Sequence, residues 1–361
     1  MPKALGRQLV VNSQLEFNKM KSAKSLANDV GQGWLSEDLR DENWWKIKIP
    51  GKVSKELLEL ASQNRIASVI QQSASVHDVK LTSAKSLLGQ VRGALNRFPG
   101  FVVLTEFPLV SEELSRIESS YLALGNCLGR PVSQSRKGDL IGKVEDKGND
   151  ISIPTVRGYE SSAALPFHCD RCDLIGMLCV RKAKEGGLSR MVSSIALHNR
   201  IAAHRPDLLR VLYEPFPHDR RGEEMPGEKP WCTMPVFWRS ITGLITRYIR
   251  RFILGSQRFP DAPRLSTEQL SAMDYIDDLI ESPEFRFEIT LNEGDLLLIN
   301  NHVILHGRTS FKDWDEPGQR RLLLRLWLSH PDSPPLPPSF RPIYGNIEAG
   351  SFRGGVWPLT T

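Results

Sequence analysis

The sequence predicts a mainly β core flanked by helices. Short apolar runs bounded by turns are typical of buried strands, and longer stretches with Leu, Ile and Val at helical spacing are typical of amphipathic helices. With 361 residues, 40% of them hydrophobic, the chain is long enough to bury a sizeable core. The strand candidates are Phe101–Thr105, Leu174–Val180, Leu296–Ile299 and Arg320–Leu328, and the helix candidates are Lys52–Gln71, Thr82–Asn96, Leu114–Leu124 and Leu270–Ile280.

The first hundred residues contain no chemical motif. We expect residues 1–100 to form a partly helical extension packed on the core, anchored by Trp34, Trp44 and Trp45, because aromatic residues at this density seldom stay exposed.

Two local patterns predict further elements later in the chain. Ser266 and Gln269 have the spacing of a capping box at the start of the last long helix. Residues 285–291 alternate between apolar and polar, which predicts a half-buried strand, and Asn292–Gly294 predicts the turn that follows it.

The charge balance excludes some partners. Lys and Arg number 47 against 42 Asp and Glu, a net charge of +5, and the basic residues are spread out. We therefore expect no nucleic-acid partner.

No stretch has the apolar length of a membrane span, and the N-terminus lacks a signal-peptide core, so we expect no membrane association and a cytoplasmic protein. A homo-oligomer is possible.

One stretch offers metal ligands and reads Leu-Pro-Phe-His-Cys-Asp, ending at Asp170. In an extended strand His168 and Asp170 would point to one face and Cys169 to the other. A second His from a distant strand would complete the 2-His-1-carboxylate face of non-haem Fe(II) oxygenases. His306 is the candidate, and His302 is its rival because it lies four residues earlier on the same strand face.

The cysteines allow a competing interpretation. Their count of five is odd, which favours free thiols over a disulfide framework. Cys169-x-x-Cys172 has the spacing of a zinc or redox pair, but no second pair accompanies it. We expect Cys169 to pack as a small hydrophobic side chain behind the strand.

Arginines interrupt the last apolar run. A buried Arg is costly unless it meets an anion, so this strand needs a carboxylate partner. By strand parity Arg321 and Arg325 share one face, and Arg320 lies on the other. A guanidinium can bind a carboxylate through two parallel hydrogen bonds. Arg321 and Arg325 form the natural inward pair, and Arg320 stays open as an alternative.

These motifs occur together in one order along the chain. As a set they resemble the TauD/TfdA-like family of Fe(II)- and 2-oxoglutarate-dependent dioxygenases, in the clavaminate synthase-like superfamily, over about Phe101 to Pro335. The resemblance implies a double-stranded β-helix, a jelly roll of two sheets with helices outside, over residues 101–335, followed by a C-terminal tail, 336–361. The matching stretches are Phe167-His168-Cys169-Asp170, Gly186-Gly187-Leu188-Ser189, Gly294-Asp295, His306-Gly307-Arg308-Thr309-Ser310-Phe311 and Arg321-Leu322-Leu323-Leu324-Arg325-Leu326-Trp327-Leu328.

The resemblance also implies a chemistry. Fe(II) would be held by His168, Asp170 and His306, the His-Gly-Arg sequence selecting His306 over His302. In addition, 2-oxoglutarate would be bound by Arg321, Ser189 and Arg325. The expected reaction consumes O₂, releases succinate and CO₂, and oxidises an unactivated C–H bond of a small organic substrate. Hydroxylation is the default, and desaturation or cyclisation in a natural-product pathway is an alternative. Another alternative is a non-catalytic metal-binding or regulatory protein on the same fold.

Substrate specificity is expected in a long, proline-rich, charged connection, residues 213–263, which has the character of a lid-like insertion. Arg247, Arg250 and Arg251 lie in it and form either a solvated helix face or a site that attracts an anionic substrate. The candidate substrate residues are Arg157, Tyr159, Trp231, Trp238 and Arg308.

Overall fold

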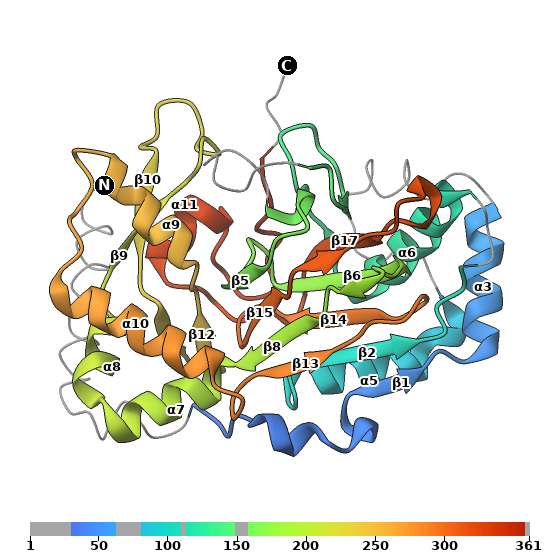
Figure 1. Ribbon diagram of the computed structural model, residues 1–361, viewed down its shortest axis with the longest axis horizontal. Coiled ribbons are helices and arrows are strands. Elements are labelled where there is room, and N and C mark those ends of the chain that lie inside the picture. The colour runs from blue at the N-terminus through green and yellow to red at the C-terminus, as the bar shows by residue number, and fades with distance from the viewer. Residues whose placement is uncertain (1–29, 63–80, 110–112, 149–157, 358–361) are drawn as a thin grey trace, which may run out of the picture.

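Two β-sheets form the centre of the protein in a computed structural model, which describes residues 30–62, 81–109, 113–148 and 158–357 (Figure 1). The larger sheet has seven strands in the order β1-β2-β14-β6-β17-β3, with β4 also pairing with β17, and the smaller has the order β13-β8-β15-β5. Among the described strands of these two sheets, only the β1–β2 pair is parallel. The larger sheet comprises β1 Lys46–Lys48, β2 Phe101–Thr105, β3 Arg130–Pro131, β4 Ile141–Val144, β6 Leu174–Arg181, β14 Leu296–Asn300 and β17 Leu322–Ser329, and the smaller comprises β5 Leu165–His168, β8 Ser189–Ser193, β13 Phe287–Ile289 and β15 Ile304–Arg308.

Helices cover the outside of both sheets (Figure 1). Three pack on the larger sheet: α3 Gly51–Ser62, α5 Lys85–Asn96 and α6 Leu114–Leu128. Three others pack beside the smaller sheet: α7 Ser194–His204, α8 Pro206–Leu212 and α10 Thr267–Glu281. The described residues also form two short helices, α9 Arg250–Gly255 and α11 Arg341–Tyr344. Three strand pairs lie outside the two sheets: β9 Phe216–Asp219 with β10 Trp231–Met234, β11 Phe237–Ser240 with β12 Gly243–Thr246, and β7 Glu185–Gly186 with β16 Phe311–Lys312. The 3₁₀ turns are Ser36–Leu39, Glu42–Trp44, Thr82–Ala84, Gly158–Glu160, Ser256–Arg258, Pro317–Gln319 and Pro338–Phe340.

Both faces of the larger sheet are buried, which explains its uninterrupted apolar strands. In β14, Leu296 and Leu298 pack toward α3, α5 and α6, whereas Leu297 and Ile299 pack toward the smaller sheet. The inner faces of the two sheets therefore share one core, as expected of the predicted jelly roll.

The N-terminal region packs on the larger sheet through two of its three tryptophans. The indole N–H of Trp34 donates to the carbonyl of Pro99 at 2.7 Å, and the ring centroid of Trp45 lies 6.0 Å from that of Phe101 on β2. Trp44, predicted as a third anchor, is 57% exposed, so that expectation is wrong. Its ring only meets the edge of the Phe98 ring.

Two predicted strands have different boundaries. β5 ends at His168, and Asp170 lies in the following turn, because the Asp170 amide bonds to the side chain of Asn301 instead of joining a ladder. β17 begins at Leu322, and its register shifts between Leu322 and Leu323, so strict parity does not relate Arg321 to Arg325.

Other local predictions are confirmed. The capping box at Ser266 and Gln269 is present at the start of α10. Residues 287–289 form the strand β13, and Gly294 occupies a turn with φ of +84°, a conformation that favours glycine. None of the helices in the described ranges is long and apolar enough to cross a membrane.

Candidate metal centre and its pockets

His168, Asp170 and His306 converge between the two sheets. His306 on β15 pairs in register with His168 at the end of β5, which brings the two imidazoles together. Asp170 Oδ1 lies 3.8 Å from His168 Nε2, and Asp170 Oδ2 lies 3.8 Å from His306 Nε2. One donor atom from each residue lies within 4.8 Å of the other two, so a single metal ion could contact all three.

Neighbouring groups hold two of these side chains in place. His168 Nδ1 lies 2.9 Å from the carbonyl of Pro166, which directs Nε2 toward Asp170. The indole Nε1–H of Trp327 donates to Asp170 Oδ2 at 2.9 Å, and Arg325 Nη1 lies 3.6 Å from the same oxygen.

The protonation states favour metal binding. Burial raises the pKa of Asp170, but Arg325, the two histidines and the Trp327 N–H outweigh it and lower that pKa to about 2. Burial, assisted by His168 and Arg325, lowers the pKa of His306 to about 3. At neutral pH the carboxylate is ionised and the imidazole is neutral, the forms that coordinate a metal.

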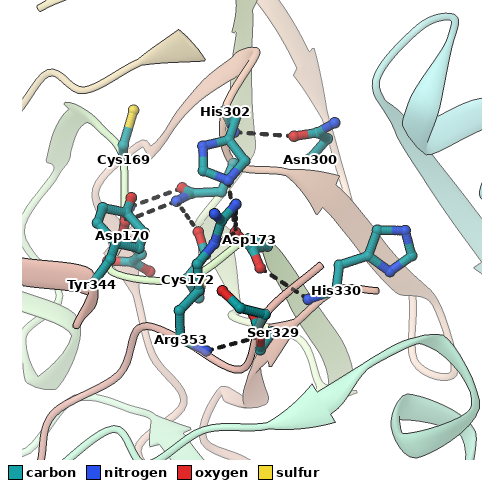
Figure 2. A network of polar contacts seen from close by, with 12 residues as sticks. Cys169, Asp170, Cys172, Asp173, Asn300, His302, Ser329, His330, Tyr344 and Arg353 are labelled. Carbon is teal, nitrogen blue, oxygen red and sulfur yellow. Dashed lines mark hydrogen bonds and ion pairs between the residues drawn. The ribbon is translucent and has the colours of Figure 1, made fainter. Parts of the chain in front are cut away.

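The rival ligands point elsewhere. His302 directs Nε2 at Asp173 Oδ1, 2.8 Å away, in a buried polar network that includes Asp170 through its main chain (Figure 2). Cys169 and Cys172 are free and buried, and they pack into different cores, which excludes a shared metal or disulfide between them in this structure.

A narrow cavity of about 40 Å³ extends from the two histidines between the sheets. Ser189, Arg308 and Arg321 line it, together with Arg325. Arg308 lies two residues beyond His306 on β15 and directly opposite Ser189 on β8, so the three share the inner face of the sheet.

Two of the guanidinium groups that line this cavity, those of Arg308 and Arg321, are buried without a counter-ion among the described residues. Arg308 Nε and Nη1 and Arg321 Nη1 have no hydrogen-bond partner, and neither side chain forms an ion pair with another described residue. Burial, with the repulsion between them, lowers the pKa of Arg308 to about 9, and burial lowers that of Arg321 to about 10. Arg308 Nη2 donates to the carbonyls of Ser161 and Ala163, but neither guanidinium has an anionic partner among the described residues, which makes the cavity suited to an anion.

Arg325 and Arg320 occupy different places. Arg325 donates through Nε to Gln134 Oε1 at 2.7 Å and stacks on Tyr159, so it lies beside the metal ligands. Arg320 is exposed and bonds to the carbonyls of Trp314 and Asp315, which leaves it no part in the cavity.

A larger pocket of about 530 Å³ is lined by His168 and Asp170. Tyr159 and Arg325 line both spaces. Much of the wall comes from residues 221–223 and 247–254 of the predicted insertion.

The other predicted substrate residues are not in the larger pocket. Trp231 donates to Asp261 Oδ1 at 3.0 Å, and Trp238 packs against an apolar cluster that includes Phe340. Neither tryptophan lines the larger pocket. Arg308 belongs to the narrow cavity instead. Arg157 lies outside the described residues.

Comparison with known proteins decides the family. Residues 63–327 match the family described as "Taurine catabolism dioxygenase TauD, TfdA family". The chain belongs to the TauD/TfdA family. This confirms the predicted class, a 2-oxoglutarate-dependent non-haem iron dioxygenase with Fe(II) and 2-oxoglutarate as cofactors.

Similar curated proteins agree with this TauD/TfdA membership. FR-33289 synthase from Streptomyces rubellomurinus is 29% identical over 311 residues, covering 82% of this chain and 88% of that protein. Uridine-5'-phosphate dioxygenase from Amycolatopsis sp. is 29% identical over 184 residues, covering 48% of this chain and 65% of that protein.

Solved structures share the TauD/TfdA fold. Asparagine oxygenase in complex with Fe(II), 2S,3S-3-hydroxyasparagine and succinate superposes with a TM-score of 0.58 at 16% identity, covering 79% of this chain and 93% of that one. The oxygenase OrfP in complex with Fe and α-ketoglutaric acid gives 0.59 at 16% identity, covering 79% and 94%. The jelly-roll prediction is therefore confirmed.

Proposed function

We propose that His168, Asp170 and His306 hold Fe(II) in this protein. The observation that carries the proposal is the convergence of two imidazoles and one ionised carboxylate on one point, with no fourth protein ligand in the described cluster. A 2-His-1-carboxylate set leaves coordination positions open for a co-substrate and O₂.

The narrow cavity is the proposed site for 2-oxoglutarate. Arg308 and Arg321 supply two buried cations for its far carboxylate, and Ser189 lies beside Arg308 on the neighbouring strand β8. His306 and Arg308 are two residues apart on β15, about 7 Å along an extended strand. This spacing suits a short dicarboxylate whose other end reaches the metal.

The cofactors, when bound, supply oxidation of a C–H bond coupled to decarboxylation of 2-oxoglutarate to succinate and CO₂. The protein's part is to hold, orient and shield. Trp327 and Arg325 hold the Asp170 carboxylate, and Arg308 and Arg321 fix the dicarboxylate. Pro166 fixes the tautomer of His168, because its carbonyl accepts a hydrogen bond from Nδ1–H and leaves Nε2 as the acceptor that faces the metal position.

The larger pocket is the proposed substrate site, and its charge favours an anionic group on the substrate. Six arginines line it against four carboxylates, one of which is the metal ligand Asp170. One relative is named for a phosphate-bearing substrate, uridine 5'-phosphate, which agrees with this polarity. Hydroxylation of such a substrate is the proposed outcome. The arginines are Arg171, Arg221, Arg247, Arg250, Arg251 and Arg325.

Anaerobic titration tests the cofactor site. Adding Fe(II) and then 2-oxoglutarate should produce a visible metal-to-ligand charge-transfer band, abolished in His168→Ala and weakened in Arg321→Ala. A folded wild-type protein that gives no band would overturn the assignment.

A substrate screen tests the larger pocket. Succinate release should be stimulated by small molecules that carry a phosphate, sulfonate or carboxylate, and much less by their neutral esters. Equal stimulation by the charged compound and its ester would contradict the proposed anion preference. Binding of Fe(II) and 2-oxoglutarate without stimulation by any compound would favour a non-catalytic role.

A further inference from the structure

The C-terminal segment, residues 336–357, lies against the turn that carries Asp170 (Figure 2). It follows the residues that match the family, which end at 327. The sequence predicts it only as a tail, yet Tyr344 and Arg353 are almost completely buried.

Backbone and side-chain contacts join this segment to consecutive residues of the turn. The Tyr344 hydroxyl donates to the carbonyl of Asp170 at 3.4 Å. Arg171 donates through Nη2 to the carbonyl of Ile343 at 3.2 Å, and its own carbonyl accepts the amide of Gly355 at 2.6 Å. Main-chain and side-chain atoms of both the C-terminal segment and the turn therefore take part in the contact.

Gly354 shows how closely the two pieces of backbone approach. Its φ is +83°, and a Cβ at this position would lie 2.5 Å from the carbonyl oxygen of Arg171 and 3.3 Å from the Cα of Cys172. Any larger residue would push the segment and the turn apart.

A buried ion pair joins Arg353 of the C-terminal segment to Asp173, the last residue of the turn. Asp173 Oδ1 accepts the Nε–H of Arg353 at 2.8 Å, and the two side chains are 1% and 0% exposed. The same carboxylate accepts His302 Nε2 at 2.8 Å and the amide of His330 at 2.9 Å. Three distant parts of the chain thus meet on the last residue of the turn (Figure 2).

We propose that the Asp173–Arg353 pair makes the C-terminal segment a positioning element of the metal site. Asp173 and Arg353 do not touch the metal position. They hold the turn, and the turn sets where the Asp170 carboxylate lies relative to His168 and His306. The inference rests on the proposed role of Asp170 as an iron ligand.

The physical reason is the cost of an unpaired buried charge. Removing Arg353 leaves the Asp173 carboxylate buried without its cation, which is strongly destabilising at that point. The turn relaxes toward water or toward another donor, and Asp170, three residues away, moves with it. Outer partners of metal ligands typically contribute 10- to 100-fold in metal affinity.

The experiment measures Fe(II) affinity of the full chain under anaerobic conditions, through the band formed with saturating 2-oxoglutarate. Arg353→Met and Asp173→Asn should each raise the Kd for Fe(II) by about tenfold or more. Arg353→Lys, which keeps the charge but offers a single donor group, should raise it less. The double variant should lie closer to wild type than either single variant, because no lone charge remains.

Leu57→Ala in α3 is the control for lost stability, since Leu57 is fully buried in the core on the far side of the larger sheet. It should lower the melting temperature and leave the Kd unchanged. Folded single variants with a wild-type Kd, or a Leu57→Ala Kd that rises as much, would overturn the inference. If wild type itself forms no band, the iron assignment fails instead, so the two failures are distinguishable. If Arg353→Met does not fold, Arg353→Lys decides.

Discussion

Trp327 and Asp170, separated by 157 positions in the sequence, are joined by a 2.9 Å hydrogen bond from the indole Nε1–H to the carboxylate Oδ2. Trp327 lies on β17 of the larger sheet, and Asp170 lies in the turn after β5 of the smaller one. The bond therefore couples the two sheets at the proposed metal position and fixes which way one ligand oxygen points.

Trp327→Phe should weaken Fe(II) binding. The variant keeps the aromatic packing and loses only the donor to a charged acceptor, a change of about 1.5 kcal/mol or roughly tenfold in Kd. Anaerobic Fe(II) titration measures it, and Trp314→Phe, at a tryptophan that is 40% exposed, should behave as wild type. An unchanged Kd in Trp327→Phe would show that the hydrogen bond does not position the carboxylate.

Arg308→Met should weaken 2-oxoglutarate binding by about 10- to 100-fold, because a charge-assisted hydrogen bond to the far carboxylate is lost. Titration calorimetry of the protein loaded with Mn(II) in place of iron measures the Kd. Arg320→Met is the matched control, since Arg320 is exposed and outside the cavity. Equal affinities for the two variants would exclude Arg308 from the site.

Asn301→Asp should destabilise the protein by at least about 2 kcal/mol. The amide Nδ2 of Asn301 donates to the carbonyls of Asp170 and Cys172, both at 2.7 Å, and an aspartate would place a carboxylate oxygen against both. Denaturant unfolding provides the measurement. Asn300→Asp, which loses one donor bond to Leu95, should cost less, and the reverse order would refute the argument.

The stability of the metal-free protein should fall as the pH falls from about 6.5 to about 4. Burial lowers the pKa of His198 from 6.5 to about 4, so in this range the unfolded chain takes up a proton that the folded protein does not. The loss should be about 3 kcal/mol for this residue. His198→Gln, which can still bond to the Tyr213 hydroxyl, should show a shallower dependence in unfolding experiments with a chelator present.

Trp45→Ala should cost about 3 to 5 kcal/mol, because it opens a cavity where the N-terminal region packs on β2. Trp44→Ala, one residue earlier and mostly exposed, should change stability by less than about 1 kcal/mol. Comparable melting temperatures for the two variants would contradict the assigned packing.

The sequence alone determined the two-sheet core and the three converging ligands. Strands buried on both faces leave a continuous apolar run. The ligand pair, the glycine turn, the distal His and the arginine strand are specific enough, as a set in this order, to indicate the family. Parity along β15 also places Arg308 on the same face as His306, so the sequence contains a signal for the narrow cavity at Arg308 and not for the substrate pocket.

Only the tertiary structure decided which groups support the site. His302 and His306 share a strand pattern in the sequence, yet His302 lies in the turn before β15 and bonds to Asp173. Strand parity could not foresee the register shift in β17. Nor could it foresee that Arg353, 180 positions after Asp173, would pair with it. Local patterns reveal which face a side chain occupies, but the partner of a buried charge is set by long-range packing, which the sequence does not display.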